Sequence, residues 1–273
     1  MSRFANKVIA VTGAGSGIGR ALALELARRG ARVAMSDVNA DGLAETARLL
    51  GNAHHMTRTF DVTAPGALGG FADAVEAEFG RVDGIINNAG LSVVAPFALM
   101  PREDFDRVMA VNFDAVVEGT RVFLPKLKAH GTGWITNISS VFGMMAYPTQ
   151  SAYNASKFAV KGFTECVRLE LEQTDPGIEV VCVHPGGIKT NVARNAKFIA
   201  GLDGSGTGLM AADNFDKAAR TTPEQAALTI LDGMERGARR VLIGPDARII
   251  DIIVRLFPVR YFRIIGNFLG IAS

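Results

Sequence analysis

Cysteine and histidine are scarce in this chain, which contains two cysteines and four histidines among 273 residues. Two thiols are too few for a disulfide framework, so we expect Cys166 and Cys182 to be small buried residues in a reducing compartment. The histidines are His54, His55, His130 and His184. Their spacing matches no metal-ligand motif. We therefore expect structural roles for all four and no metal site.

A large excess of charge is also absent, since 29 Lys and Arg against 27 Asp and Glu give a formal net charge of +2. No run of Lys and Arg interleaved with aromatic residues occurs, which excludes a nucleic-acid partner. Hydrophobic residues make up 48% of the chain and charged residues 21%, enough for a large core. Residues 1–7 lead directly into a predicted strand, so we expect no signal peptide and a cytoplasmic protein.

No linker, repeat or low-complexity tract divides the chain. Short runs rich in β-branched residues alternate with longer helical patterns, which indicates repeated βα units and a parallel sheet. The predicted strands are Lys7–Thr12, Arg32–Ser36, His54–Thr59, Gly84–Ile86, Gly133–Ile138, Glu179–His184 and Arg240–Ile243. The predicted helices are Gly17–Arg29, Ala40–Leu50, Ala67–Phe79, Arg102–Ala129, Ser151–Gln173 and Pro223–Arg236. The pattern predicts an α/β fold: a single doubly wound Rossmann-like domain, with a seven-stranded parallel sheet and helices on both faces.

Two segments interrupt this alternation. Residues 189–222 are glycine-rich and weakly periodic, and a long stretch of this kind inside a domain is typical of a lid. We assign the lid to a catalytic domain spanning residues 1–245.

Residues 246–273 extend the same domain by two predicted amphipathic helices, which Pro258 separates. Their charged side chains exclude a simple transmembrane span. We expect the apolar faces of these helices to cover the protein's own body or a subunit contact. The alternative is that they lie in a membrane interface as a peripheral contact.

A glycine-rich loop, Thr12-Gly13-Ala14-Gly15-Ser16-Gly17-Ile18-Gly19, joins the first predicted strand to the first predicted helix. The common G-x-G-x-x-G spacing fits in no register, whereas G-x-x-x-G-x-G does. Such a loop brings backbone N–H groups to a pyrophosphate at a helix N-terminus. The candidate contacts are Gly13, Gly15, Ser16, Gly17, Ile18 and Gly19.

Asp37 follows the second strand, about twenty residues beyond this loop, where a carboxylate can accept hydrogen bonds from an adenosine ribose. The same carboxylate would repel a 2′-phosphate, and the neighbouring Ser16 and Val38 are not basic. The sequence therefore favours NAD over NADP. The alternative is that Asp37 caps the next helix.

Further candidates for the nucleotide site follow the third and fourth strands. Ligands of open parallel sheets bind at the carboxyl ends of the strands, which is where these residues lie. They are Asp61, Val62, Asn88, Ala89 and Gly90.

Tyr153 and Lys157 are four residues apart in a predicted helix, so their side chains share one face. A phenol titrates near ~10, and a neighbouring cation should lower the pKa of Tyr153 enough for acid/base chemistry. Ser140 lies thirteen residues before the tyrosine.

In combination these motifs resemble the short-chain dehydrogenase/reductase family over residues 5–245. The motifs are Thr12 to Gly19, Asn87 to Gly90, Asn112, Ser140, Tyr153-x-x-x-Lys157 and Pro185-Gly186-x-x-x-Thr190. The resemblance implies that Tyr153 exchanges a proton with the substrate oxygen, which Ser140 also holds. It implies that Lys157 bonds the nicotinamide ribose and that Asn112 holds a water linking Lys157 to solvent. Further cofactor contacts would come from Pro185, Gly186, Ile188 and Thr190.

The implied activity is hydride transfer between NAD(H) and a secondary alcohol or ketone. The candidate pocket is largely apolar, so we expect a hydrophobic substrate. The alternative is that several of its residues pack into the core or an oligomer contact. The pocket residues are Leu91, Val93, Val94, Phe97, Phe142, Met144, Met145, Tyr147, Phe198, Leu202, Met210 and Phe215. The alternatives are an NADPH-dependent carbonyl reductase and a non-catalytic nucleotide-sensing module. The resemblance also implies a homodimer or homotetramer, with the helices 102–129 and 151–173 at the contact.

Overall fold

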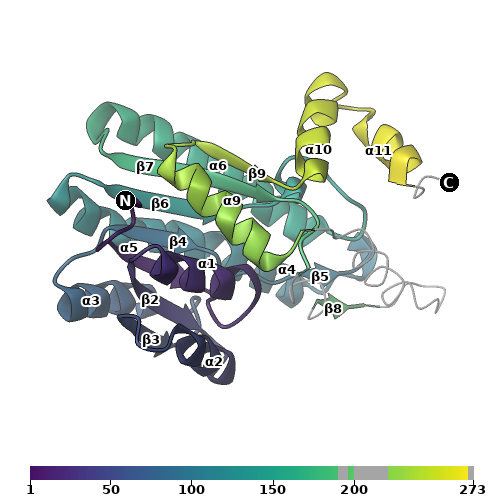
Figure 1. Ribbon diagram of the computed structural model, residues 1–273. Coiled ribbons are helices and arrows are strands. Elements are labelled where there is room, and N and C mark those ends of the chain that lie inside the picture. The colour runs from purple at the N-terminus through teal and green to yellow at the C-terminus, as the bar shows by residue number, and fades with distance from the viewer. Residues whose placement is uncertain (190–195, 200–220, 270–273) are drawn as a thin grey trace.

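The computed structural model describes residues 1–189, 196–199 and 221–269, and a seven-stranded parallel sheet lies at its centre (Figure 1). The strand order is β3-β2-β1-β4-β6-β7-β9, so the order of connection reverses between β1 and β4. The strands are β1 (Val8–Thr12), β2 (Arg32–Asp37), β3 (His55–Thr59), β4 (Gly84–Asn87), β6 (Gly133–Ile138), β7 (Ile178–Pro185) and β9 (Arg240–Ile243). All seven predicted strands are confirmed, with ends that differ by one residue at most.

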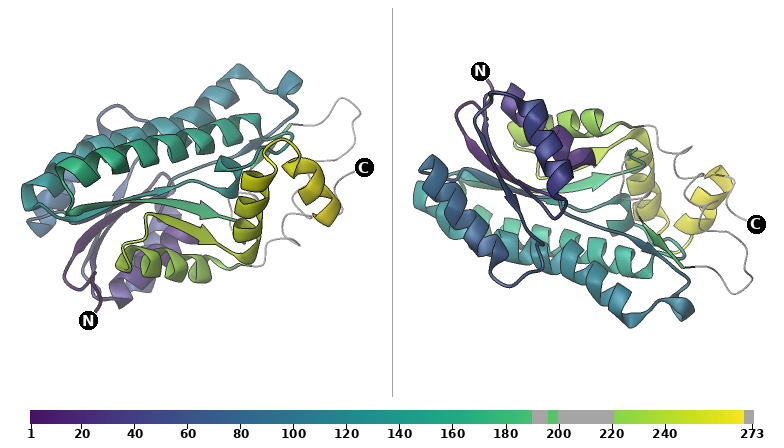
Figure 2. Two further views of the ribbon diagram at one scale, coloured as in Figure 1. Left: turned by 90° about the horizontal axis from the view of Figure 1, so that it is seen from above. Right: turned by 90° about the horizontal axis from the view of Figure 1, so that it is seen from below.

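Helices cover both faces of the sheet, which Figure 2 shows as a three-layer arrangement. One layer contains α1 (Gly17–Arg28), α2 (Ala40–Leu50) and α9 (Pro223–Glu235), and the other contains α3 (Ala67–Phe79), α5 (Ala115–His130) and α6 (Ser151–Thr174). The side chains of β1 divide between the two cores. Ile9 and Val11 pack toward α1, while Val8 and Ala10 pack toward α3 and α5. Burial on both faces explains why the strand has no polar side.

The helix predicted over residues 102–129 is present as one continuous helical segment, but a π-helical turn that the sequence did not predict interrupts its regular α-helical geometry. The segment consists of α4 (Arg102–Met109), a π-helical turn (Ala110–Asp114) and α5. The turn places Asn112, which is fully buried, against the backbone of Leu91. A π-turn re-aims a side chain without ending the helix, and helical periodicity in the sequence does not reveal it.

Part of the predicted lid forms a second, two-stranded sheet. β8 (Lys197–Phe198) pairs in parallel with β5 (Val93–Val94), and Lys197 forms an ion pair of 2.6 Å with Asp104. Residues 190–195 and 200–220 of the predicted lid, which include Thr190, Leu202, Met210 and Phe215, lie outside the described residues.

The C-terminal extension forms the two expected helices, α10 (Pro245–Leu256) and α11 (Tyr261–Leu269), beyond the carboxyl end of β9 (Figure 1). Asp251 of α10 binds Arg240 of β9 through two hydrogen bonds, and Ala247 is buried. The extension therefore packs against the body of the protein. Within the described ranges, no helix has the length and apolar character needed to cross a membrane.

The two cysteines differ from each other. Cys182 is buried in β7, as predicted, but Cys166 is exposed on α6. The prediction of burial for Cys166 is wrong, because its position falls on the solvent side of a helix that covers the sheet.

Candidate active site

The glycine loop begins and ends with residues that leave no room for a side chain. Gly13 adopts φ +67°, and a Cβ there would lie 2.8 Å from Ala89 Cα. A Cβ on Gly19, in the first turn of α1, would lie 2.0 Å from the Gly13 carbonyl oxygen. Ser16 is the N-cap of α1, Gly17 is its first residue, and Ile18 packs against the core. The loop therefore places backbone close to the N-terminus of α1, where an anion is stabilised.

The Asp37 carboxylate forms a hydrogen bond with the backbone of this loop. Its Oδ2 accepts the Gly15 N–H at 2.8 Å, and its Oδ1 accepts the Asn39 N–H at 2.8 Å. A Cβ on Gly15 would lie 2.8 Å from the carboxylate. Asn39, whose side chain accepts the Gly42 N–H, is the N-cap of α2. The alternative that Asp37 caps this helix is therefore wrong.

The residues after β4 hold the loop from the other side. The Asn88 side chain donates to the carbonyls of Thr12 at 2.9 Å and Gly13 at 3.1 Å. The backbone N–H groups of Asn88 and Ala89 both donate to the Thr12 hydroxyl. After β3, exposed Asp61 accepts hydrogen bonds from Thr63 in a turn.

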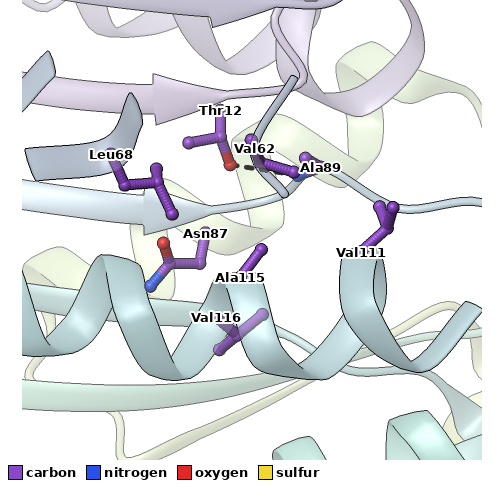
Figure 3. Close-up of a pocket in the computed structure, with 8 residues that line it drawn as sticks. All are labelled: Thr12, Val62, Leu68, Asn87, Ala89, Val111, Ala115 and Val116. Carbon is purple, nitrogen blue, oxygen red and sulfur yellow. Dashed lines mark hydrogen bonds between the residues drawn. The ribbon is translucent and has the colours of Figure 1, made fainter. Parts of the chain in front are cut away.

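A small pocket lies between the ends of β1 and β4 and helix α5 (Figure 3). Its side chains pack too closely to enclose a ligand, so this pocket alone does not hold a dinucleotide. Its lining includes the candidates Val62 and Ala89. The remaining lining residues are Thr12, Leu68, Asn87, Val111, Ala115 and Val116.

Tyr153 and Lys157, on α6, lie beside Ser140 at the carboxyl end of β6. The Lys157 ammonium is 5.6 Å from the centroid of the Tyr153 ring and donates to the Ile138 carbonyl at 2.9 Å. A Cβ on Gly90 would lie 3.6 Å from Lys157 Nζ, so the segment after β4 also lies close to the Lys157 ammonium. The ends of β4 and β6 thus converge on one pair of side chains.

The pKa of Tyr153 departs from the sequence-based prediction. Burial raises this pKa, and the Ser140 hydroxyl lowers it by a smaller amount. Burial also lowers the pKa of Lys157 to about 8. The predicted fall in the pKa of Tyr153 is wrong for the polypeptide alone, because the ammonium lies over the ring and bonds a carbonyl instead of the phenol.

Asn112 connects the π-turn to this site. Its side chain accepts the Leu91 N–H and donates to the Leu91 carbonyl, each at 2.9 Å, and also donates to Ser156. A Cβ on Gly90 would lie 3.2 Å from Asn112 Oδ1. Asn112 therefore fixes the segment after β4 close to Lys157, and its role in holding a water stays a prediction.

The segment after β7 carries the remaining candidates. Pro185 ends the strand, Gly186 N–H donates to Ile243, and Ile188 is buried. Asp246, in the first turn of α10, accepts the Gly187 N–H at 2.7 Å. A Cβ on Gly186 would lie 2.2 Å from the Asp246 carboxylate. The C-terminal extension thus supports this segment directly.

Residues 140–147, here called the serine loop, are held by Asn154, for which the sequence predicts no role, and by His184, for which it predicts a structural one. Buried Asn154 donates to the carbonyls of Phe142 and Met145, each at 2.8 Å, and accepts the Tyr147 N–H at 3.1 Å. His184 Nδ1 lies 3.1 Å from the Ser140 carbonyl oxygen. Asn154 is adjacent to Tyr153 in sequence. The only signal that could have identified it is that a polar residue occupies the buried side of the helix at this position.

The predicted pocket residues do not all line one surface. Val93, Met144 and Met145 are buried in the hydrophobic cores, whereas Phe97 is 76% exposed. Phe142 and Tyr147 are partly exposed, and their rings stack with centroids 5.5 Å apart. Phe142 also lies edge to face with Tyr153, and Tyr147 extends this aromatic surface away from Tyr153.

The fold and the site together define a nucleotide-binding protein of the doubly wound class, with a Ser-Tyr-Lys constellation at the carboxyl ends of its strands. The family model described as short chain dehydrogenase matches residues 7–198. This chain belongs to the short-chain dehydrogenase/reductase family and is an oxidoreductase of that family.

Similar proteins support this assignment. A putative oxidoreductase, SadH, of Mycobacterium tuberculosis is 46% identical over 270 residues, which cover 97% of this chain and 96% of that protein. A cyclopentanol dehydrogenase of Comamonas sp. is 38% identical over 195 residues, covering 70% of this chain and 76% of that protein. A short-chain dehydrogenase/reductase of Burkholderia phymatum, solved in complex with NAD, aligns with a TM-score of 0.86 at 26% identity, covering 94% and 95% of the two chains.

Proposed function

We propose that this protein is an NAD(H)-dependent oxidoreductase that interconverts a hydrophobic secondary alcohol and its ketone. The observation that carries the proposal is the convergence of Ser140, Tyr153 and Lys157 beside Gly90. A sensing module without turnover has no need of a phenol placed between a hydroxyl and an ammonium, so we favour the enzyme.

The site fits a dinucleotide. Backbone packs against backbone at Gly13 and Gly19, so the loop presents N–H groups at the N-terminus of α1, and Asn88 fixes the loop to β4. We assign the pyrophosphate to residues 13–19, the adenosine end to Asp37, Asp61 and Val62, and the nicotinamide end to residues 88–90, 185–188 and 190. The bound nicotinamide supplies or accepts the hydride.

The chain's own residues supply the proton chemistry. The Ser140 hydroxyl donates to the substrate oxygen and holds it beside the Tyr153 hydroxyl. In oxidation, the ionised Tyr153 accepts the alcohol proton, and in reduction its phenol donates one. Lys157 has two further N–H groups besides the one directed at Ile138, and these would bond the nicotinamide ribose hydroxyls. A positioned proton relay of this kind contributes about 10²–10⁴-fold in rate.

An apolar alcohol suits the open part of the site, where the Phe142 ring contacts Tyr153 and stacks on Tyr147. The similarity to a cyclopentanol dehydrogenase supports a cyclic secondary alcohol. The test is Tyr153→Phe: turnover of cyclopentanol with NAD⁺ should fall by roughly 10²–10⁴-fold, with NADH affinity unchanged. Unchanged turnover would remove the assigned acid/base role.

For the cofactor, we propose NAD because the Asp37 carboxylate lies against the glycine loop. Asp37→Ala should raise the ratio of kcat/KM for NADP⁺ to that for NAD⁺ by roughly 10-fold or more, since it removes a charge that repels the 2′-phosphate. Asp41→Ala, on the exposed first turn of α2, is the matched control. Equal ratios in the two variants would favour the NADPH-dependent reductase.

We also propose a homo-oligomer formed through the α4–α5 and α6 surface. Phe158 and Leu169 of α6 are 42% and 52% exposed, and eleven residues correspond to three helical turns, so they share one face. Phe158→Asp should reduce the mass in light scattering. An unchanged mass would place the contact elsewhere.

Two predictions about location remain proposals: a cytoplasmic protein and a peripheral membrane contact. The contact is supported by Ile249, Ile252 and Leu256 of α10, which are 47%, 57% and 66% exposed. Leu256→Ser should weaken co-sedimentation with anionic vesicles. If wild type and variant sediment equally, the membrane contact is wrong.

A further inference from the structure

A chain of aromatic rings connects the catalytic tyrosine to the C-terminal extension. The rings of Tyr153 and Phe142 meet edge to face with centroids 6.1 Å apart. Phe142 stacks on Tyr147 at 5.5 Å and an interplanar angle of 17°. Tyr147 contacts Phe262 of α11 at 6.0 Å and 65°. All four side chains retain partial exposure, so they form a surface and not a closed core.

The extension fixes this surface by polar contacts as well. The Tyr261 hydroxyl of α11 accepts the Ala146 N–H at 3.0 Å, while Asn154 holds the same loop from α6. Ile265 of α11 is buried, so the helix is seated on the body of the protein. The position of Phe262 is therefore set by the fold and does not depend on a bound ligand.

We propose that Phe262 is a specificity-determining residue: with Tyr147 and Phe142 it forms an aromatic wall that selects secondary alcohols carrying a flat apolar ring. This inference rests on the proposed oxidoreductase function and narrows its substrate class. A planar ring bound on the wall gains contact with aromatic faces and edges, which a small saturated ring or a linear chain cannot match. The wall begins at Tyr153, so a ring lying on it brings its attached carbinol to the proton-transfer group.

The experiment compares cyclopentanol with indan-1-ol, in which the same five-membered ring is fused to benzene. We expect the wild type to prefer indan-1-ol in kcat/KM with NAD⁺. Phe262→Ala should reduce that preference by roughly 10-fold, because it removes the outer part of the wall. Phe262→Leu keeps the apolar volume but has no flat face. It should also reduce the preference for indan-1-ol.

Two further variants separate selection from general damage. Phe257→Ala makes the same change in the extension at a half-exposed ring outside the chain of contacts, and it should keep the wild-type preference. Tyr261→Phe loses only the hydrogen bond to Ala146, so kcat should fall to a similar degree for both alcohols. Melting curves confirm that each variant is folded.

A binding measurement distinguishes the two possible failures. The Kd of indan-1-one for the enzyme with NAD⁺, a complex that has no hydride to transfer and so does not react, should rise about 10-fold in Phe262→Ala in calorimetry and stay constant in Phe257→Ala. If the wild type oxidises neither alcohol, the proposed function is wrong. If turnover is normal but Phe262→Ala and Phe262→Leu leave both the preference and the Kd unchanged, the aromatic wall does not select the substrate.

Discussion

The two ends of the cofactor crevice are built in opposite ways. At the glycine loop, backbone approaches backbone, and the site depends on side chains that are missing, as at Gly13 and Gly19. At the serine loop, the site depends on side chains that are present. Some of these come from far along the chain, such as Tyr261, which is 115 residues from its partner Ala146.

This difference decides which kind of change each end tolerates. Adding one carbon atom should damage the glycine loop, because no space is available for it. Removing polar atoms should damage the serine loop, because their buried partners would be left without hydrogen bonds. Four variants test this contrast, from the largest expected effect to the smallest.

Gly19→Ala should have the largest effect. Its Cβ would lie 2.0 Å from the Gly13 carbonyl oxygen, so the loop must move. We expect NADH affinity to fall by roughly 100-fold, equivalent to about 3 kcal/mol, in a fluorescence titration. Gly69→Ala in α3 is the matched control, since no atom lies within 4 Å of its Cβ. Alanine is the better helix former, so this control should raise the free energy of unfolding by up to about 1 kcal/mol. Equal losses of NADH affinity in both variants would contradict the crowding argument.

Asn154→Ala removes one side chain that makes three hydrogen bonds to the serine loop. The free energy of unfolding should fall by about 3 kcal/mol in urea, at about 1 kcal/mol for each bond. Ser140 would be less well placed, so kcat should fall by roughly 10- to 100-fold with little change in NADH affinity. Asn154→Asp keeps the acceptor for Tyr147 but turns a carboxylate oxygen toward the carbonyls of Phe142 and Met145, so it should be at least as damaging as Asn154→Ala. An NADH affinity that falls as far as kcat would show that Asn154 supports the whole crevice.

The contrast also explains how far the sequence could predict the molecule. The strands and the glycine loop are local patterns, and every predicted strand is present. The π-turn at Asn112 was missed because its cause, the Leu91 backbone, lies 21 residues away. The pKa of Tyr153 was predicted in the wrong direction because spacing places Lys157 on the correct face but does not determine burial or the bond to Ile138. Contacts of the extension with the serine loop depend on the folded chain and leave no local pattern.

His184 gives a pH-dependent test of the serine loop. Burial lowers its pKa from 6.5 to about 4, so the unfolded chain takes up the proton first as the pH falls. Stability from the neutral imidazole is full above about pH 6.5 and is lost as the pH approaches 4. Between pH 7 and 5, this group should cost the wild type about 2 kcal/mol of unfolding free energy. Asparagine does not titrate. Between pH 7 and 5, the free energy of unfolding of His184→Asn, measured in urea, should therefore fall by about 2 kcal/mol less than that of the wild type. Parallel pH profiles would show that His184 is not held neutral.

Arg255→Ala should have the smallest effect. Arg255 and Arg240 both bind Asp251 of α10, but the Arg255 side chain is 65% exposed and that of Arg240 is 22% exposed. Solvent screens an exposed ion pair, so its loss should cost no more than about 0.5 kcal/mol in unfolding and leave kcat unchanged. Asp251 keeps both hydrogen bonds to Arg240, and α10 therefore stays in place. A large fall in kcat for Arg255→Ala would mean that a surface charge, and not the half-buried pair with Arg240, holds the extension against the serine loop.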